Sequence, residues 1–97
     1  MYARLTEINI KPEKIEEAIE LYRKSVVPAA KSQKGFMGLY LLTDRPTGKG
    51  LAITFWKTEQ DALANERNLY YQQQLVKFIE FFQSPPIREG YEISVKA

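Results

Sequence analysis

The hydrophobic residues gather in four short runs rich in β-branched and aromatic side chains, and these runs predict four β-strands. Turn residues fill positions 44–50 between the second and third runs, which favours an antiparallel hairpin. In the last run, Ile87 and Tyr91 alternate with charged positions such as Arg88, so we expect one apolar face and one face in water. The four runs cover residues 2–10, 36–43, 51–56 and 87–95.

Two longer stretches show the spacing of an amphipathic helix. The first begins after Pro12, which the opening turn of a helix accommodates. We expect Pro28 to stop or kink this helix near Val27, and Gly35 to supply the conformation that ends a further turn. The apolar positions of this first stretch are Ile15, Ala18, Ile19, Tyr22 and Val26.

The second helical stretch begins at Thr58, whose hydroxyl stands three residues before Asp61 in the manner of a capping box. Asn68 is placed to cap a fresh turn, after which the apolar residues of positions 71–82 keep helical spacing. The helix must end at the double proline that follows Ser84.

The order of these elements is β-α-β-β-α-β, the ferredoxin-like arrangement of an α+β domain, with a four-stranded antiparallel sheet and both helices on one face. A length of 97 residues fits a single domain over residues 1–97. In the second strand, Phe36, Tyr40 and Leu42 are as apolar as the positions between them. Because helices cover only one face, we expect the other face to pack on the sheet of a second copy, giving a homodimer.

The composition excludes several kinds of chemistry. The chain has no cysteine and no histidine, which excludes thiol nucleophiles, imidazole bases and metal sites built on those residues. Its 14 basic and 12 acidic side chains are dispersed, which argues against nucleic acid or a membrane as partner. No apolar run is long enough to span a bilayer and no signal-peptide pattern is present, so we expect a cytoplasmic protein.

One motif suggests RNA binding. Lys34-Gly35-Phe36 copies the start of an RNA-recognition signature, and that module shares the β-α-β-β-α-β order. The signature belongs on the third strand, however, whereas here it lies on the second, and Met37 and Gly38 depart from the pattern. RNA binding is therefore disfavoured.

Four short patterns carry a resemblance to a known family. They are Ile10-Lys11-Pro12-Glu13-Lys14, Lys34-Gly35-Phe36, Phe55-Trp56-Lys57-Thr58 and Asn68-Leu69-Tyr70-Tyr71. Through them nearly the whole chain resembles the antibiotic biosynthesis monooxygenase domain family, which consists of small dimeric α+β barrel proteins. The patterns include no catalytic signature, so the resemblance indicates the fold and the dimer more strongly than an activity.

The resemblance implies several possible activities. Members of the family include cofactor-independent monooxygenases acting on polycyclic phenols, quinol oxidases, haem-degrading enzymes and proteins of no known activity. The haem-degrading members use a histidine to hold iron beside a tryptophan and an asparagine; Trp56 falls where the tryptophan belongs, but the chain has no histidine. Tyr70, Tyr71 and Met37 are the remaining candidates for an iron ligand, and we expect no metal and no cofactor.

A cofactor-free oxygenase needs a dry aromatic pocket and a hydrogen bond that favours a phenolate, because an electron-rich phenolate passes an electron to dioxygen by itself. Trp56 alone is assigned through its position in the family pattern, and it competes with a role in plain packing. Tyr70 and Tyr71 lie about 100° apart on a helix, so we expect one of them at most to face the pocket squarely. The substrate-binding candidates are Trp56, Tyr70, Tyr71, Tyr40, Phe36, Asn9, Asn65 and Arg67.

Two functions of different classes stay open, and no catalytic residue is identified. The first is a cofactor-independent monooxygenase or quinol oxidase that acts on an aromatic or phenolic small molecule. The second is a non-catalytic small-molecule-binding or regulatory dimer on the same scaffold, since a fold does not fix a function.

Overall fold

The computed structural model describes residues 1–97, apart from the side chain of Asn65. Its strands form one sheet with the order β2-β3-β1-β4, and every neighbouring pair is antiparallel. This topology confirms the ferredoxin-like α+β fold. The strands are β1 (Tyr2–Asn9), β2 (Phe36–Asp44), β3 (Lys49–Trp56) and β4 (Ile87–Glu92).

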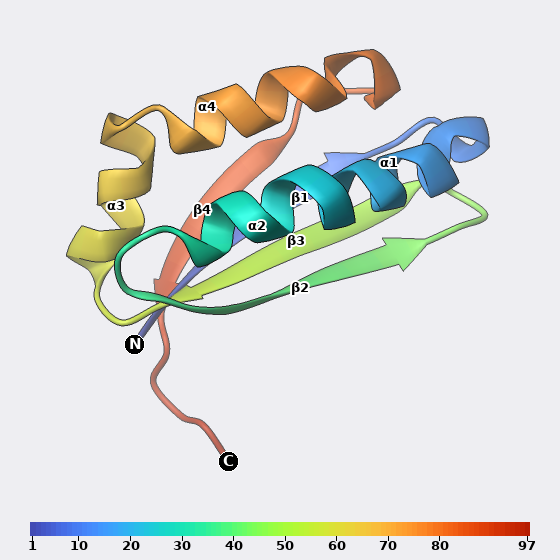
Figure 1. Cartoon of the computed structure of the whole chain (residues 1–97). Coiled ribbons are helices and arrows are strands. Elements are labelled where there is room, and N and C mark those ends of the chain that lie inside the picture. Colours follow the sequence, from blue (N-terminus) through green and yellow to red (C-terminus); the bar gives the residue numbers. More distant parts are fainter.

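Two helical stretches connect the strands, and Figure 1 shows them on one side of the sheet. The stretch between β1 and β2 comprises η1 (Pro12–Lys14), α1 (Ile15–Leu21), the π-helical η2 (Tyr22–Val26) and α2 (Val27–Lys31). The stretch between β3 and β4 comprises α3 (Glu59–Arg67), α4 (Tyr70–Leu75) and the 3-10 segment η3 (Val76–Phe81).

Of the predicted stop or kink near Val27, the stop does not occur: the helix continues past Pro28, and Figure 1 shows α1 and α2 as one continuous ribbon. The N–H of Val27 donates to the carbonyl of Tyr22, five residues earlier, in the wider π-helical turn. Pro28 then falls in the first turn of α2, where a missing N–H costs no hydrogen bond. Gly35 follows the helix with φ +81°, the conformation expected of it.

Both predicted caps of the second helical stretch are confirmed. The Thr58 hydroxyl accepts a hydrogen bond of 3.1 Å from the backbone N–H of Asp61 at the start of α3. The Asn68 side chain accepts one of 3.0 Å from the N–H of Tyr70, and Leu69 between them has φ +68°. This reversal ends α3 and starts α4 as a separate helix.

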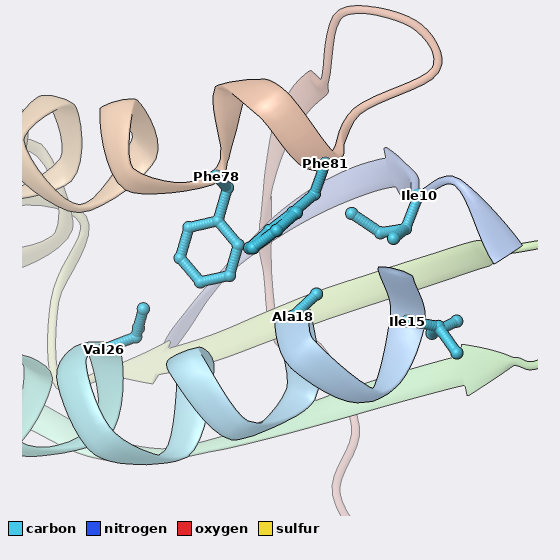
Figure 2. Packing of buried hydrophobic residues seen from close by; sticks show 6 residues of the cluster. All are labelled: Ile10, Ile15, Ala18, Val26, Phe78 and Phe81. Atoms are coloured by element: carbon cyan, nitrogen blue, oxygen red, sulfur yellow. The ribbon is translucent and has the colours of Figure 1, made fainter. Parts of the chain in front are cut away.

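The core lies between the two helical stretches (Figure 2). The rings of Phe78 and Phe81 meet edge to face with their centroids 6.2 Å apart. Partly buried side chains, among them Ile8 and Tyr22, pack against this core and extend it towards the sheet. The buried members of the cluster are Ile10, Ile15, Ala18, Val26, Phe78 and Phe81.

The two faces of the sheet differ in their cover. Since successive side chains of a strand point to opposite faces, the residues that line the space beneath the helices mark one face and their neighbours mark the other. Leu5, Ile53 and Tyr40 are partners across three strands on the uncovered face. Tyr40 is 64% exposed there, and its ring meets that of Phe55 edge to face. An apolar face without helices is what the sequence predicted for the middle of the sheet.

The last strand turns Arg88 inward, which corrects the prediction that this residue faces water. Ile87 and Tyr91 lie on the uncovered face and are 56% and 54% exposed, whereas Arg88 lines the space beneath the helices. The strand also ends at Glu92 rather than at residue 95. The physical reason for the inward arginine is that it finds a carboxylate and an aromatic ring there, which are described below.

Candidate functional site

A cavity of about 90 Å³ lies between the sheet and the helices η2 and α4. Apolar atoms form most of its wall, as is usual for a small-molecule site. The sheet supplies Thr6, Ile8, Ala52, Thr54, Trp56 and Arg88 to the lining. The helical side supplies Tyr22, Val26, Tyr70, Tyr71, Gln74 and Leu75, with Phe78 and Phe82 at the end towards the core.

Trp56 is the largest fully buried side chain of the protein among the residues described, with none of its surface exposed. It is the last residue of β3, and its indole Nε1–H donates to the Thr54 hydroxyl at 2.9 Å. The ring of Phe36 meets the indole edge to face at 5.8 Å between centroids. The indole is therefore held in one orientation, and it serves both as core and as cavity wall.

Tyr70 and Tyr71 both line the cavity. They form the first turn of α4, directly after the backbone reversal at Leu69, and the cavity extends across that turn. The guanidinium carbon of Arg88 lies 3.6 Å from the centre of the Tyr71 ring, in a cation–π contact. Tyr70 thus forms part of the cavity wall, while Tyr71 holds Arg88.

Three charged side chains lie together beside the cavity. Glu66 of α3 forms ion pairs with Arg4 of β1 and, at 3.0 Å, with Nε of Arg88 of β4. Their side chains are 15% exposed for Arg4, 27% for Glu66 and 16% for Arg88. Burial lowers the pKa of Arg88, although a guanidinium stays protonated at physiological pH. The cluster therefore holds two positive charges against one negative charge.

Burial also raises the pKa of two tyrosines in the cavity lining. It raises the pKa of Tyr70 to about 12, and it raises the pKa of Tyr22 further. Both phenols are therefore neutral at physiological pH, so they can donate a hydrogen bond to a ligand but cannot serve as bases.

The raised pKa of Tyr70 predicts a loss of stability in alkali. Because the folded state holds this proton more tightly than the unfolded state, its contribution is complete below about pH 10 and is lost as the pH rises towards about 12. The free energy of unfolding, measured in denaturant across this range, should fall more steeply for the wild type than for Tyr70→Phe. Equal slopes would contradict the assignment.

Four of the other sequence candidates are not among the lining residues of the cavity. Phe36 packs behind the tryptophan, and Tyr40 lies on the opposite face of the sheet. Asn9 ends β1, where its side chain and backbone carbonyl meet Gln83. Arg67 is exposed in the last turn of α3, and the side chain of Asn65 lies outside the described residues.

Sequence reasoning missed Arg4, Glu66 and Arg88 as a group. A usable signal was present, because Arg4 has the same strand parity as Thr6, and Arg88 has the opposite parity to Ile87. A single arginine in a strand is usually a solvated residue, however, and its carboxylate partner comes from a helix distant in the sequence.

The described residues hold no group of three or more acidic side chains placed to bind a metal ion. No helix formed by them is long and apolar enough to cross a membrane.

A helix-covered antiparallel sheet with an aromatic cavity beneath the helices defines a small α+β domain of the ferredoxin-like class. Residues 1–75 match the model of the family described as Antibiotic biosynthesis monooxygenase, and the chain belongs to this family. The uncharacterised protein Rv2557 of Mycobacterium tuberculosis is 31% identical over 97% of this chain and 41% of its own length. The chain thus spans about two fifths of that relative.

Solved structures agree with the fold. The monooxygenase from the gene ActVA-Orf6 of Streptomyces coelicolor, in complex with Nanaomycin D, superposes with a TM-score of 0.80 at 13% identity, covering 99% of this chain and 89% of that one. Rv0793 from Mycobacterium tuberculosis superposes with a TM-score of 0.78 at 11% identity, covering 99% and 97%. At such identities the likeness concerns the fold alone.

Proposed function

We propose that this protein binds an aromatic phenolic small molecule in the cavity and oxidises it with dioxygen, as a cofactor-independent monooxygenase or quinol oxidase. The observation that carries the proposal is the apolar, aromatic cavity walled by Trp56, Tyr70 and Tyr71. Family membership supports it, as does the binding of Nanaomycin D by a relative of the same fold.

The reaction asks little of the protein. A bound hydroquinone gives two electrons and two protons to dioxygen and leaves as the quinone with hydrogen peroxide. A monooxygenation of a phenol instead places one oxygen atom on a ring carbon; the ring gives up two electrons and two hydrogens, which convert the other oxygen atom to water, and the product is a quinone. The protein's part is to remove water from the ring, to hold it flat against Trp56 and to stabilise the developing oxyanion. Tyr70, which lines the cavity as a neutral phenol, is our candidate for donating a hydrogen bond to that oxyanion.

The size of the cavity bears on how a ligand enters. Its volume of about 90 Å³ is smaller than the roughly 150 Å³ that accommodates benzene in an apolar protein cavity. We therefore propose that α4, which has no buried residue and begins at the reversal of Leu69, moves outward when a ligand binds.

A non-catalytic ligand-binding dimer is the second candidate. It is favoured by the absence of a base in the cavity: no carboxylate is among the lining residues that the structure describes, and its buried tyrosines are protonated. In that case the phenol would bind and leave unchanged.

The proposed assembly is a homodimer in which two uncovered sheet faces meet. That face presents apolar side chains from all four strands, including Leu5, Tyr40, Ile53 and Ile87. Apolar surfaces of this kind are typical of an interface that stays buried in the working protein.

The proposal predicts quenching of Trp56 followed by oxygen uptake. Trp56 is the only tryptophan, so its fluorescence reports on the cavity alone. The protein is titrated without oxygen with hydroquinones and naphthols, air is admitted, and oxygen consumption is recorded. Saturable quenching followed by uptake above that of the free ligand is the expected result. Quenching without oxygen uptake would favour the non-catalytic ligand-binding dimer. No quenching by any ligand of the panel would contradict both the oxygenase and the binding dimer.

A further inference from the structure

The cavity is apolar, but one charged side chain enters its lining. Among the described residues that line it, Arg88 alone carries a charge, and the face of Tyr71 covers its guanidinium. A cation in an apolar wall has a strong effect on any ligand beside it, because the low local dielectric leaves its field poorly screened.

The charge of Arg88 is only partly compensated. Glu66 is its carboxylate partner, and the same oxygen, Oε1, also faces Nη2 of Arg4. Two guanidinium groups therefore share one carboxylate oxygen, and the Nε of Arg4 is buried without a hydrogen bond. The cluster retains one net positive charge at the side of the cavity.

The backbone makes room for this cluster. Gly90 of β4 is the register partner of Arg4, and a Cβ at position 90 would lie 2.6 Å from Nη1 of Arg4. The hydroxyl of Tyr2 would also meet that Cβ, so a larger residue at position 90 would make the ends of the Tyr2 and Arg4 side chains shift. The glycine, the two arginines and the glutamate thus form one arrangement built from β1, α3 and β4.

We propose that the Arg4–Glu66–Arg88 cluster makes the cavity selective for an aromatic oxyanion, with Arg88 as the group that meets it. Glu66 acts as a positioning residue that holds Arg88 and limits the excess of positive charge. The inference rests on the proposed function, since it concerns the ligand of the same cavity. A phenolate and an aromatic carboxylate share the required chemistry, a flat ring that carries a delocalised negative charge.

The test uses a nitrophenol, whose phenolate absorbs visible light, and its methyl ether as a neutral probe of nearly the same shape. Binding of each is followed by Trp56 fluorescence, and the pKa of bound nitrophenol is read from its absorbance. In the wild type we expect the pKa of the bound probe to lie about one unit below that of the free probe, which is a tenfold preference for the anion. A parallel titration with a nitrobenzoate shows whether the cavity binds a carboxylate as well as a phenolate.

Substitutions at the cluster should change this pKa in opposite directions. Arg88→Met should weaken nitrophenolate binding about 10-fold to 100-fold, the scale of a hydrogen bond to a charged group, and change binding of the methyl ether less than about twofold. Arg88→Lys, which keeps the charge, should retain most of the preference. Glu66→Gln should lower the pKa of the bound probe further, an effect that a merely structural role would not produce.

The outcomes separate this inference from the proposed function. If the methyl ether and the nitrophenol bind equally well and Arg88→Met changes neither, the cavity binds aromatics without selecting an anion and the inference is overturned. If neither probe binds the wild type, the proposed ligand site itself is wrong. Circular dichroism of each variant checks that it is folded, and Arg88→Met keeps Glu66 paired with Arg4.

Discussion

If the proposed sheet-to-sheet homodimer forms, replacing Ile53 with aspartate should convert it into a monomer. Ile53 lies in the middle of the uncovered face, with Leu5 and Tyr40 as its partners in the neighbouring strands. In a symmetric sheet-to-sheet dimer the substitution enters the interface twice, and each buried carboxylate without a partner costs at least roughly 2 kcal/mol. We therefore expect dimerisation to weaken by about 1,000-fold or more, measured by light scattering or sedimentation over a range of concentrations.

The matched control is Gln60→Asp, which adds the same charge to an exposed position in the first turn of α3, where an acidic residue suits the helix. This variant should dimerise like the wild type. A wild-type protein that stays monomeric at high concentration would disprove the sheet-to-sheet interface, as would an Ile53→Asp variant that remains a dimer.

The alternation and spacing of apolar residues were sufficient to predict the fold. Thr58 and Asn68 were read correctly as caps because a cap depends on hydrogen bonds between near neighbours in the chain. The unpartnered face was also predictable, because Tyr40 and Leu42 alternate with the equally apolar Leu39 and Leu41, so neither side of this strand is marked as wet. Local chemistry decides features of this kind, so a single sequence reveals them.

The errors arise where a distant contact overrides local preference. Arg88 was placed in water because it alternates with the apolar residues Ile87 and Tyr91. Its carboxylate partner, Glu66, comes from α3, which packs on β1 and β3. Pro28 is a separate case with a local cause: it was expected to stop or kink the helix, and the π-helical turn before it lets the helix continue. Trp56 and Tyr70 were candidates for the cavity from the sequence, but the cation in its wall depends on tertiary structure alone.

Trp56→Ala should lower the free energy of unfolding by about 3–5 kcal/mol, the usual cost of deleting a large buried aromatic side chain. The indole is completely buried, its ring packs against Phe36, and its N–H is bonded to Thr54, so no neighbour can fill the space. Unfolding in denaturant, followed by circular dichroism, gives the change. A loss below about 1 kcal/mol would mean that the helices close over the vacated space.

Trp56→Phe separates packing from ligand binding. It keeps an aromatic ring in the core but removes the N–H and part of the cavity wall, so the fold should survive with a smaller loss of stability. If the ligand packs against the indole, the affinity for a naphthol should fall about fivefold to tenfold, which corresponds to the loss of one good aromatic contact. Because the only tryptophan is gone, affinity is measured from the rise of Tm with ligand concentration, compared with the same rise in the wild type. A variant that is less stable yet binds the naphthol as tightly as the wild type would assign Trp56 to packing alone, and would leave Tyr70, Tyr71 and Arg88 to define the ligand site.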